Sequence, residues 1–555
     1  MKKVKRNFLT AGFLYTILFS MIVFTSTNLF PQETVKKEIE KYTQNLPFDF
    51  PELSVPQFPD KNYNIKDYGA IGDGYTKNTE AINKAIAECS ANGGGHVLIP
   101  PGVWITGSIE LRSNVDLHAQ KGALVVFSAD HKDFPLIKTG GNSYDVMNPL
   151  YGVDLENLAI TGEGIFDGNG QTWRPIKKNK MTSQQWKELL ASGGVVSEKG
   201  DMWWPNSESM NAEKYLSQKK KSELTKEDFE NVRDFLRPYM FYLNKCKNIF
   251  LENFTLQNSP KFAMNLRGCE NVIVRQVKVM NEWWTQNGDG LDFSACKNVL
   301  IYGCTVNAGD DAICMKSSGN SDKGSKMENI VIADCVVYAG HGGFVIGSNT
   351  DGGIKNISVR NCSFLGTDTG LRFKSGIGRG GLVENIFIEN ISMKDIKDEA
   401  IIFDMFYSDA AAVKMMDDKI ENHKIPNFQN IFISNVICDG ASQAILVKGL
   451  DAEPVKNIII KDSFIKSKIG AELNEAEGFV FENVKILTDK TPVISLINSW
   501  NFKIVNPFIK DSDSIFIKAA GNKTKQIIIE GSKGLITNKN IEISSEIDFS
   551  EIITK

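Results

Sequence analysis

The sequence predicts an all-β solenoid, the parallel β-helix. From residue 244 onward a short segment recurs, for example NKCKNIFLENFTL, RGCENVIVRQVKV and SACKNVLIYGCTV, and its opening Asn falls at 248, 271, 298, 329, 356, 385, 430 and 457. Apolar and polar residues alternate after the Asn, which is the pattern of a strand with one buried face. Most copies lie 23 to 31 residues apart, about the length of one coil. No amphipathic helix separates the strands, which disfavours βαβ folds.

Stacked coils place equivalent residues in register. Adjacent coils of a solenoid lie about 4.8 Å apart, so the recurring Asn is expected to form a ladder in the turns. Cys246, Cys269 and Cys296 recur in the same way and are expected in the core. The chain has nine cysteines, an odd number, and most lie in apolar segments. We therefore favour buried small hydrophobes over a disulfide framework.

Two helical regions are expected outside the strand repeat. A helix from Asn78 to about Ser90 would cap the open first coil, as solenoids require. Residues 171–237 are rich in Lys, Glu and Trp and are predicted to be a helical insertion. This insertion contains two capping boxes, Thr182/Gln185 and Thr225/Asp228. We interpret it as a lid or cleft wall; a solvated decoration without function explains it equally well.

The N-terminal composition predicts export. A basic start is followed by the apolar stretch Phe8 to Phe24, so residues 1–30 are expected to be a signal peptide or an N-terminal anchor. The protein would then be periplasmic or extracellular. Residues 31–58 are charged and then Pro-rich, which predicts a linker, and residues 59–555 are expected to form a single β-helix domain. No later stretch is apolar enough to cross a bilayer, and the net charge of −4 argues against nucleic acid as a partner.

Two acidic clusters, NGDGLD and GDD, are one coil apart. Asp289 precedes Asp310 by 21 positions and Asp311 by 22, so the three should stack on one face. Carboxylates within about 5–10 Å repel one another, and some of their pKa values should rise. Acid/base catalysis or cation binding would explain such a cluster. Asp292 is out of phase and is expected to be a structural hydrogen-bonding group.

Four tripeptides, in order, resemble the motifs NTD, DD, GHG and RIK of the polygalacturonases, glycoside hydrolase family 28. They are Asn287-Gly288-Asp289, Gly309-Asp310-Asp311, Gly340-His341-Gly342 and Arg372-Phe373-Lys374. The resemblance extends over about residues 62–510. It implies a right-handed parallel β-helix that hydrolyses α-1,4-linked galacturonic acid in pectin with inversion, without a metal or other cofactor.

The resemblance also implies roles. Asp310 would be the general acid, kept protonated by like-charge crowding, while Asp289 and Asp311 hold and activate water. His341 would lie beside the acid and help to set its protonation. The implied substrate-binding residues are Asn287, Arg372, Lys374 and Tyr407. The departures Gly288, Gly309 and Phe373 remove no titrating group, but they leave the shape of the subsites open.

Several alternatives remain at this stage. Exo action is favoured because the insertion could block one end of the cleft, against endo action or a rhamnogalacturonan or xylogalacturonan hydrolase. From other classes, a calcium-dependent pectate lyase or a non-catalytic polysaccharide-binding β-helix would share the fold. The expected partner is a pectic polysaccharide or oligogalacturonide, and the chain is expected to be a monomer.

Overall fold

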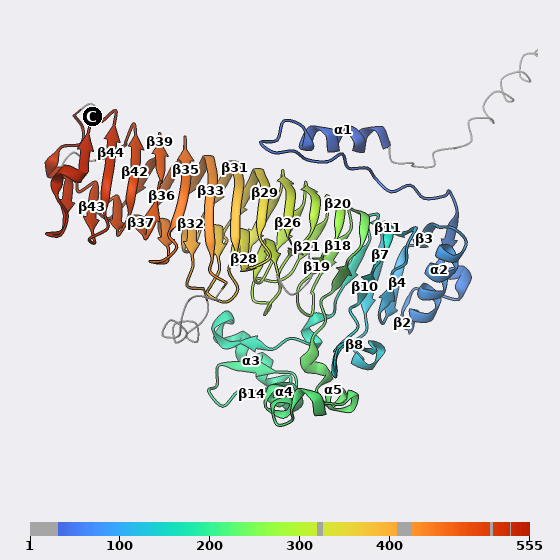
Figure 1. Cartoon of the computed structure of the whole chain (residues 1–555). Helices are drawn as coiled ribbons and strands as arrows, with labels where there is room; N and C mark the ends of the chain where they lie inside the picture. The colour runs from blue at the N-terminus through green and yellow to red at the C-terminus, as the bar shows by residue number, and fades with distance from the viewer. Residues whose placement is uncertain (1–31, 319–325, 408–423, 511–513, 533) are drawn as a thin grey trace, which may run out of the picture.

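The computed structural model describes residues 32–318, 326–407, 424–510, 514–532 and 534–555. These residues form an elongated right-handed parallel β-helix (Figure 1), as predicted. Its described strands form two long sheets, of 27 and 14 strands. The predicted signal peptide or anchor, residues 1–30, lies outside the described residues. Among the described residues, no helix has both the length and the hydrophobicity needed to cross a bilayer.

The 14-stranded sheet carries one strand per coil, and its register is parallel throughout the coils around the acidic clusters. Each coil therefore repeats the side-chain positions of the one before it. In sheet order the relevant strands are β10 (Leu150–Val153), β16 (Phe241–Asn244), β19 (Met264–Arg267), β22 (Leu291–Ser294), β25 (Asp311–Ser317), β28 (Gly342–Thr350), β30 (Thr369–Lys374), β32 (Glu399–Asp404) and β34 (Gln443–Lys448).

The predicted asparagine ladder is confirmed. Asn298 Nδ2 donates to Asn271 Oδ1 at 3.0 Å, and Asn329 Nδ2 donates to Asn298 Oδ1 at 3.1 Å. Each Asn turns the chain with a positive φ, 56° at Asn271 and at Asn298, where the short amide side chain is tolerated. All nine cysteines are described, and all are free and buried, which confirms their expected place in the core.

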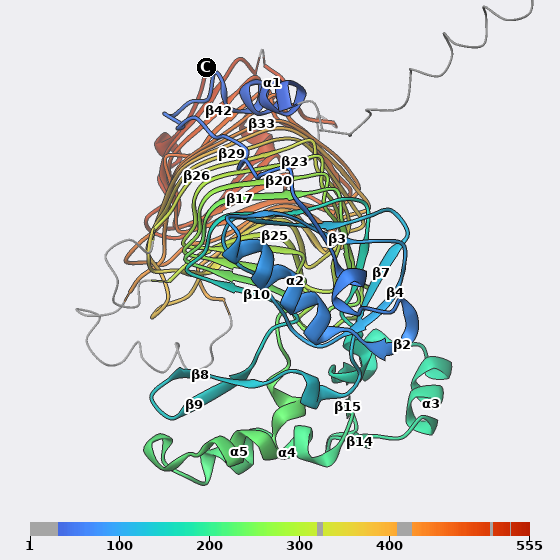
Figure 2. The same ribbon diagram turned by 90° about the vertical axis from the view of Figure 1, so that its right-hand side faces the viewer.

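Helix α2 (Thr79–Ala91) lies where the capping helix was expected and crosses the N-terminal end of the solenoid (Figure 2). Ile82, Ala85, Ile86 and Cys89 are fully buried, so one face of the helix closes the core of the first coils. An amphipathic helix is suited to this end because a solenoid has no further coil there to cover its apolar interior.

The insertion is mainly helical and lies beside the first coils (Figure 1). It contains α3 (Ser183–Ala191), α4 (Ser207–Ser217), α5 (Lys226–Asn231) and a small sheet of β13 (Ile176–Lys177), β14 (Val195–Val196) and β15 (Met202–Trp204). Both predicted capping boxes are present. The hairpin β8 (Leu136–Gly140) and β9 (Ser143–Val146) comes from the coil before it, and α5 packs against both strands.

Residues 32–58 differ from the expected linker. Helix α1 (Gln32–Thr43) and the chain that follows it lie against the outside of the 27-stranded sheet, and we call them the N-terminal strap (Figure 1). Val35, Ile39, Tyr42 and Leu53 are buried there with strand residues such as Leu300. The structure thus corrects the tether interpretation, because the apolar side of this charged segment covers apolar positions on the outside of the coils.

Candidate active site

The sheet register brings the two acidic clusters together, as predicted. Asp289 lies two residues before β22, and Leu291 pairs with Ile313 on β25, so Asp289 is beside Asp311. The backbone confirms this register, since Gly290 N donates to Asp311 O at 2.9 Å. Carboxylate oxygens of Asp289, Asp310 and Asp311 all lie within 4.8 Å of one another. One turn of the solenoid has made a single acidic site from two distant motifs.

Protein cations border this acidic site. Lys374 Nζ is 2.6 Å from Asp311 Oδ2, and Arg372 Nη1 is 3.2 Å from Asp311 Oδ1. These two side chains come from alternate positions of β30 and therefore point to the same face. His341 Nδ1 lies 3.0 Å from Asp310 Oδ1. The predicted residues on the C-terminal side of the cluster are thus in contact with it.

The pKa values of the three carboxyl groups are shifted in different directions. Burial raises the pKa of Asp289 well above its usual range, further raised by the negative charge of Asp310, although Lys316 opposes this. For Asp311, burial is outweighed by Lys374 and Arg372, which lower its pKa. Because the groups interact this closely, they share protons as one titrating unit. Of the three carboxyl groups, Asp289 has the surroundings that most favour the protonated form.

Asp310 contradicts the expectation that crowding keeps it protonated. Burial would raise its pKa, but the hydrogen bond that His341 Nδ1 donates, together with the positive charges of Lys374 and Lys316, lowers it below the usual range. The repulsion between neighbouring acids is outweighed because the fold brings basic side chains from other coils to the same point. Asp310 is therefore ionised in the free protein.

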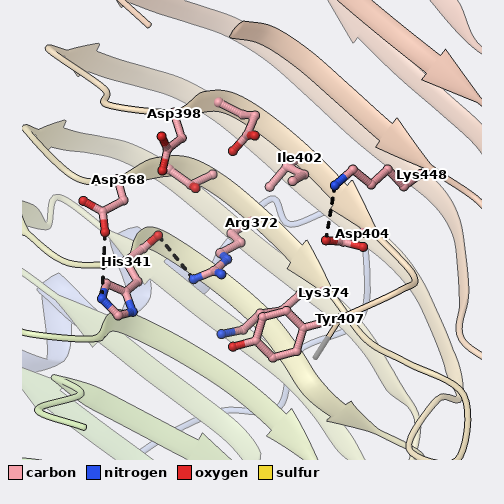
Figure 3. Close-up of a pocket in the computed structure, with 11 residues that line it drawn as sticks. His341, Asp368, Arg372, Lys374, Asp398, Ile402, Asp404, Tyr407 and Lys448 are labelled. Atoms are coloured by element: carbon pink, nitrogen blue, oxygen red, sulfur yellow. Dashed lines mark hydrogen bonds and ion pairs between the residues drawn. The ribbon is translucent and has the colours of Figure 1, made fainter. Parts of the chain in front are cut away.

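The predicted residues Arg372, Lys374, His341 and Tyr407 line one pocket of about 320 Å³ (Figure 3). The Tyr407 ring lies 4.7 Å from Lys374 Nζ and 5.5 Å from the Arg372 guanidinium carbon. The other lining residues are Asp368, Thr369, Asp398, Glu399, Ile402, Asp404 and Lys448. A pocket with two adjacent cations and an aromatic edge can hold a sugar that carries a carboxylate.

Two basic residues of the site were not predicted. Lys316 on β25 lies 3.4 Å from Asp289 Oδ2 and forms a closer ion pair with Asp292, which confirms the structural role expected for Asp292. A lysine at the end of the apolar strand AICMK was a usable signal, because buried lysines are nearly always paired.

Lys180 reaches the site from the insertion. Its Nζ donates to Gly309 O at 3.0 Å and lies 3.3 Å from His341 Nε2. An ammonium group can only donate, so Nε2 accepts and the His341 proton is on Nδ1, which donates to Asp310. No sequence signal distinguished Lys180 among the many lysines of the insertion.

Asn287 lies on the opposite side of the cluster from Arg372. It adopts a φ of 53°, and its Oδ1 accepts a hydrogen bond of 3.0 Å from Arg237 Nη2. Arg237 also donates to Gln286 O at 3.1 Å, so the last residue of the insertion fixes the loop before Asp289. The predicted site residues are therefore brought together around Asp289, Asp310 and Asp311 on one face of the solenoid.

Clustered carboxylates with unequal pKa values, on the face of a parallel β-helix and beside a polar pocket, define the site of a glycoside hydrolase. Sequence comparison agrees with this class. A model of the glycosyl hydrolases family 28 matches residues 175–480, and a model described as rhamnogalacturonase A/epimerase, pectate lyase-like matches residues 62–130. Since the first model spans more than half of the chain, the protein belongs to glycosyl hydrolases family 28 and is a glycosidase.

Individual relatives are distant in sequence. The chain is 25% identical over 414 residues to a probable polygalacturonase of Vitis vinifera, covering 72% of this chain and 73% of that protein. It is 27% identical over 363 residues to an exo-poly-alpha-D-galacturonosidase of Dickeya chrysanthemi, covering 63% and 58%. The structure resembles that of a hyperthermoactive exopolygalacturonase from Thermotoga maritima, with a TM-score of 0.64 at 28% identity, over 82% of this chain and 96% of that one.

Proposed function

We propose that the protein is an exported polygalacturonase that hydrolyses α-1,4-linked galacturonic acid in pectin. The observation that carries this proposal is the contact between the acidic site and the Arg372/Lys374 pair at 3.2 and 2.6 Å. A uronate carboxylate bound by these cations would place its glycosidic bond beside the three acids. The pectic polymer or oligogalacturonide is thus the substrate class that the Arg372/Lys374 pair favours.

Asp310 is the general acid in this proposal. Its side chain is 21% exposed, whereas Asp289 and Asp311 are 5% and 3% exposed, so Asp310 is the carboxyl group that a substrate can reach. A bound uronate would pair with Lys374, one of the cations that lower the pKa of Asp310. Substrate binding would therefore raise this pKa and let Asp310 take a proton from the shared cluster.

Asp289 and Asp311 hold the attacking water. Inverting glycosidases usually separate their two carboxyl groups by about 6.5–9.5 Å to admit water, but here the nearest oxygens lie within 4.8 Å. We propose that the water binds against the Asp289/Asp311 pair rather than midway between two single acids. Proton NMR of the first product should then show the β anomer. An α anomer as the first product would instead indicate double displacement.

Exo action is supported by two relatives and by the insertion. The Dickeya and Thermotoga relatives are named as exo-acting enzymes. The insertion lies beside the coils (Figure 1), and its last residue, Arg237, is hydrogen-bonded to Asn287. The alternative from another class, a calcium-dependent lyase, is not favoured by the donor set. Asp289 and Asp311 are already paired with Lys316, Arg372 and Lys374, which offset the charge that a cation would neutralise.

Product analysis tests the function. The purified protein is incubated with polygalacturonate and, separately, with rhamnogalacturonan, and the products are resolved by anion-exchange chromatography. Saturated mono- or digalacturonate released from the start supports exo hydrolysis, and the Asp310→Asn variant should release none. Unsaturated products that absorb in the ultraviolet, or full activity of Asp310→Asn, would contradict the proposal.

A further inference from the structure

A second pocket lies on the other side of the acidic site. Its volume is about 410 Å³, and its floor is formed by Tyr239, Lys261, Gln286 and Asn287. These residues precede β16, β19 and β22, three consecutive strands of the 14-stranded sheet. The pocket of Arg372 and Lys374 is formed by β28 to β34 of the same sheet. A chain that crosses Asp289, Asp310 and Asp311 therefore extends from one pocket into the other.

The insertion and the β8–β9 hairpin wall the second pocket. Tyr144 and Asp145 come from the hairpin, and Met202, Trp204, Glu213 and Phe235 come from the insertion. The Trp204 and Phe235 rings are stacked at 6.4 Å. Tyr239, on the floor, packs against Phe262 with ring centroids 5.0 Å apart. Aromatic faces of this kind are suitable for contact with the apolar face of a sugar.

Lys261 differs from the other residues on the floor of the pocket because its charged group has no hydrogen-bonding or ionic partner among the described residues. Its ammonium lies 4.9 Å from the centre of the Tyr239 ring and 5.9 Å from that of Phe262, and it makes no hydrogen bond or ion pair with the described residues. Burial and the nearby Arg237 lower the pKa of Lys261. Holding an unpaired, half-buried cation costs free energy, which a bound anion would recover.

The other charged groups of the pocket do not neutralise Lys261, so an anion can bind there. Arg237 bonds to Gln286 O and Asn287 Oδ1 and has no carboxylate partner among the described residues. Of the acids that line the pocket, Glu213 is exposed, whereas burial raises the pKa of Asp145. The charges of Asp145 and Asp289 act on Lys261, but neither carboxylate forms an ion pair with it. Lys261 and Arg237 are half-buried and place two cations next to Asn287.

We infer that this pocket is a closed terminal subsite, in which Lys261, supported by Arg237, binds the carboxylate of the last uronate of the chain. The inference rests on the proposed function and deepens it. The walls end the cleft there, so the cleaved bond lies at a fixed number of sugar units from the end of the chain. Lys261 selects an end that is not methyl-esterified.

Binding of oligogalacturonides tests this subsite. Trigalacturonate and its two mono-esters, methylated on one or the other terminal unit, are titrated by calorimetry into the inactive Asp310→Asn protein. We expect one mono-ester to bind at least tenfold more weakly than the free acid. Adding Lys261→Met should weaken the binding of trigalacturonate by the same factor. It should also remove the difference in affinity between the free acid and that mono-ester. Lys214→Met, an exposed change on α4, is the matched control and should alter neither value.

The outcomes separate this inference from the function. If the native enzyme hydrolyses polygalacturonate but Lys261→Met binds acid and esters as its parent does, the subsite is wrong and the function stands. If no sugar is released but binding depends on Lys261, the subsite stands and the hydrolytic proposal fails. Equal affinity of the Asp310→Asn protein for the acid and both esters, or no binding at all, also overturns the inference.

Discussion

Burying Asp289 costs folding stability, and its place in the acidic site explains this cost. It is almost fully buried, its Oδ1 accepts no hydrogen bond within the described structure, and its ion pair with Lys316 is 3.4 Å long. Its neighbour Asp292 is equally buried but pairs more closely with the same lysine. Burial raises the pKa of both carboxyl groups, but only Asp292 has a close ion pair with Lys316 to offset this cost.

Substituting each of these acids should show the difference. Because the folded state raises the pKa of Asp289, that group favours folding at low pH, and its contribution is lost as pH rises above about 4. Asp289→Asn should therefore gain at least ~1 kcal/mol of stability at neutral pH while activity is lost. Asp292→Asn should lose ~3 kcal/mol by breaking a buried pair. Denaturant unfolding at pH 4 and pH 7 measures both, and a destabilised Asp289→Asn at pH 7 would contradict the assignment.

The titration of Asp310 makes a second prediction. The cations that lower its pKa in the free protein include Lys374, which a uronate would occupy. Loss of the acid proton should therefore occur at a higher pH in the profile of kcat than in that of kcat/KM, since these report the complex and the free enzyme respectively. A substrate methyl-esterified at the unit bound by Lys374 should show no such separation. If kcat and kcat/KM fell at the same pH for both substrates, this result would contradict the mechanism.

The insertion places Lys180 in direct contact with the catalytic cluster. Lys180, at the end of the short helix η4 (Lys178–Lys180), fixes the tautomer of His341 through its contact with Nε2. The insertion thus contacts the active site and also lines the second pocket.

Removing this contact should lower the rate without unfolding the protein. We expect Lys180→Met to reduce kcat by about tenfold, the equivalent of one hydrogen bond of ~1.4 kcal/mol, and to move the pH profile because His341 is no longer held in one tautomer. Lys187→Met, an exposed change on α3, is the control. Unchanged kcat and pH profile in Lys180→Met would assign Lys180 a purely structural role.

Repeated elements were predicted better than single ones. The coils were found because each turn requires an Asn at positive φ and each strand a period of two, which are local requirements. The acids were found from their one-coil spacing. Lys180 was missed because its contacts cross 129 and 161 residues of sequence. The packing of α1 was missed although Val35, Ile39 and Tyr42 have helical spacing, because the charged composition around them resembles that of a linker.

The N-terminal strap connects distant coils of the whole molecule. Glu38 on α1 accepts hydrogen bonds from Arg275 at 2.8 Å and Tyr302 at 3.1 Å, and Arg275 also pairs with the fully buried Glu252 at 2.7 Å. Further along, Phe58 lies edge-on to His96 near the first coils. The strap therefore covers the apolar outside of several coils and completes a buried ion pair.

Truncation tests whether the strap belongs to the folded domain. Deleting residues 1–58 should cost at least ~2 kcal/mol, about the burial energy of one large apolar side chain, and lower the midpoint of thermal unfolding. Deleting residues 1–31 alone is the control and should leave the midpoint unchanged. Equal midpoints for the two truncations would restore the linker interpretation for residues 32–58.

The strap and the catalytic cleft occupy different sides of the solenoid. Helix α1 contacts β23 (Lys297–Tyr302) and β26 (Met327–Ala333) of one sheet, the acids lie on the other, and the two views place α1 and the insertion on opposite sides of the long axis (Figures 1 and 2). Fusion or surface immobilisation through the N-terminus would thus leave the cleft open to an insoluble polymer. Attachment through the insertion would obstruct it.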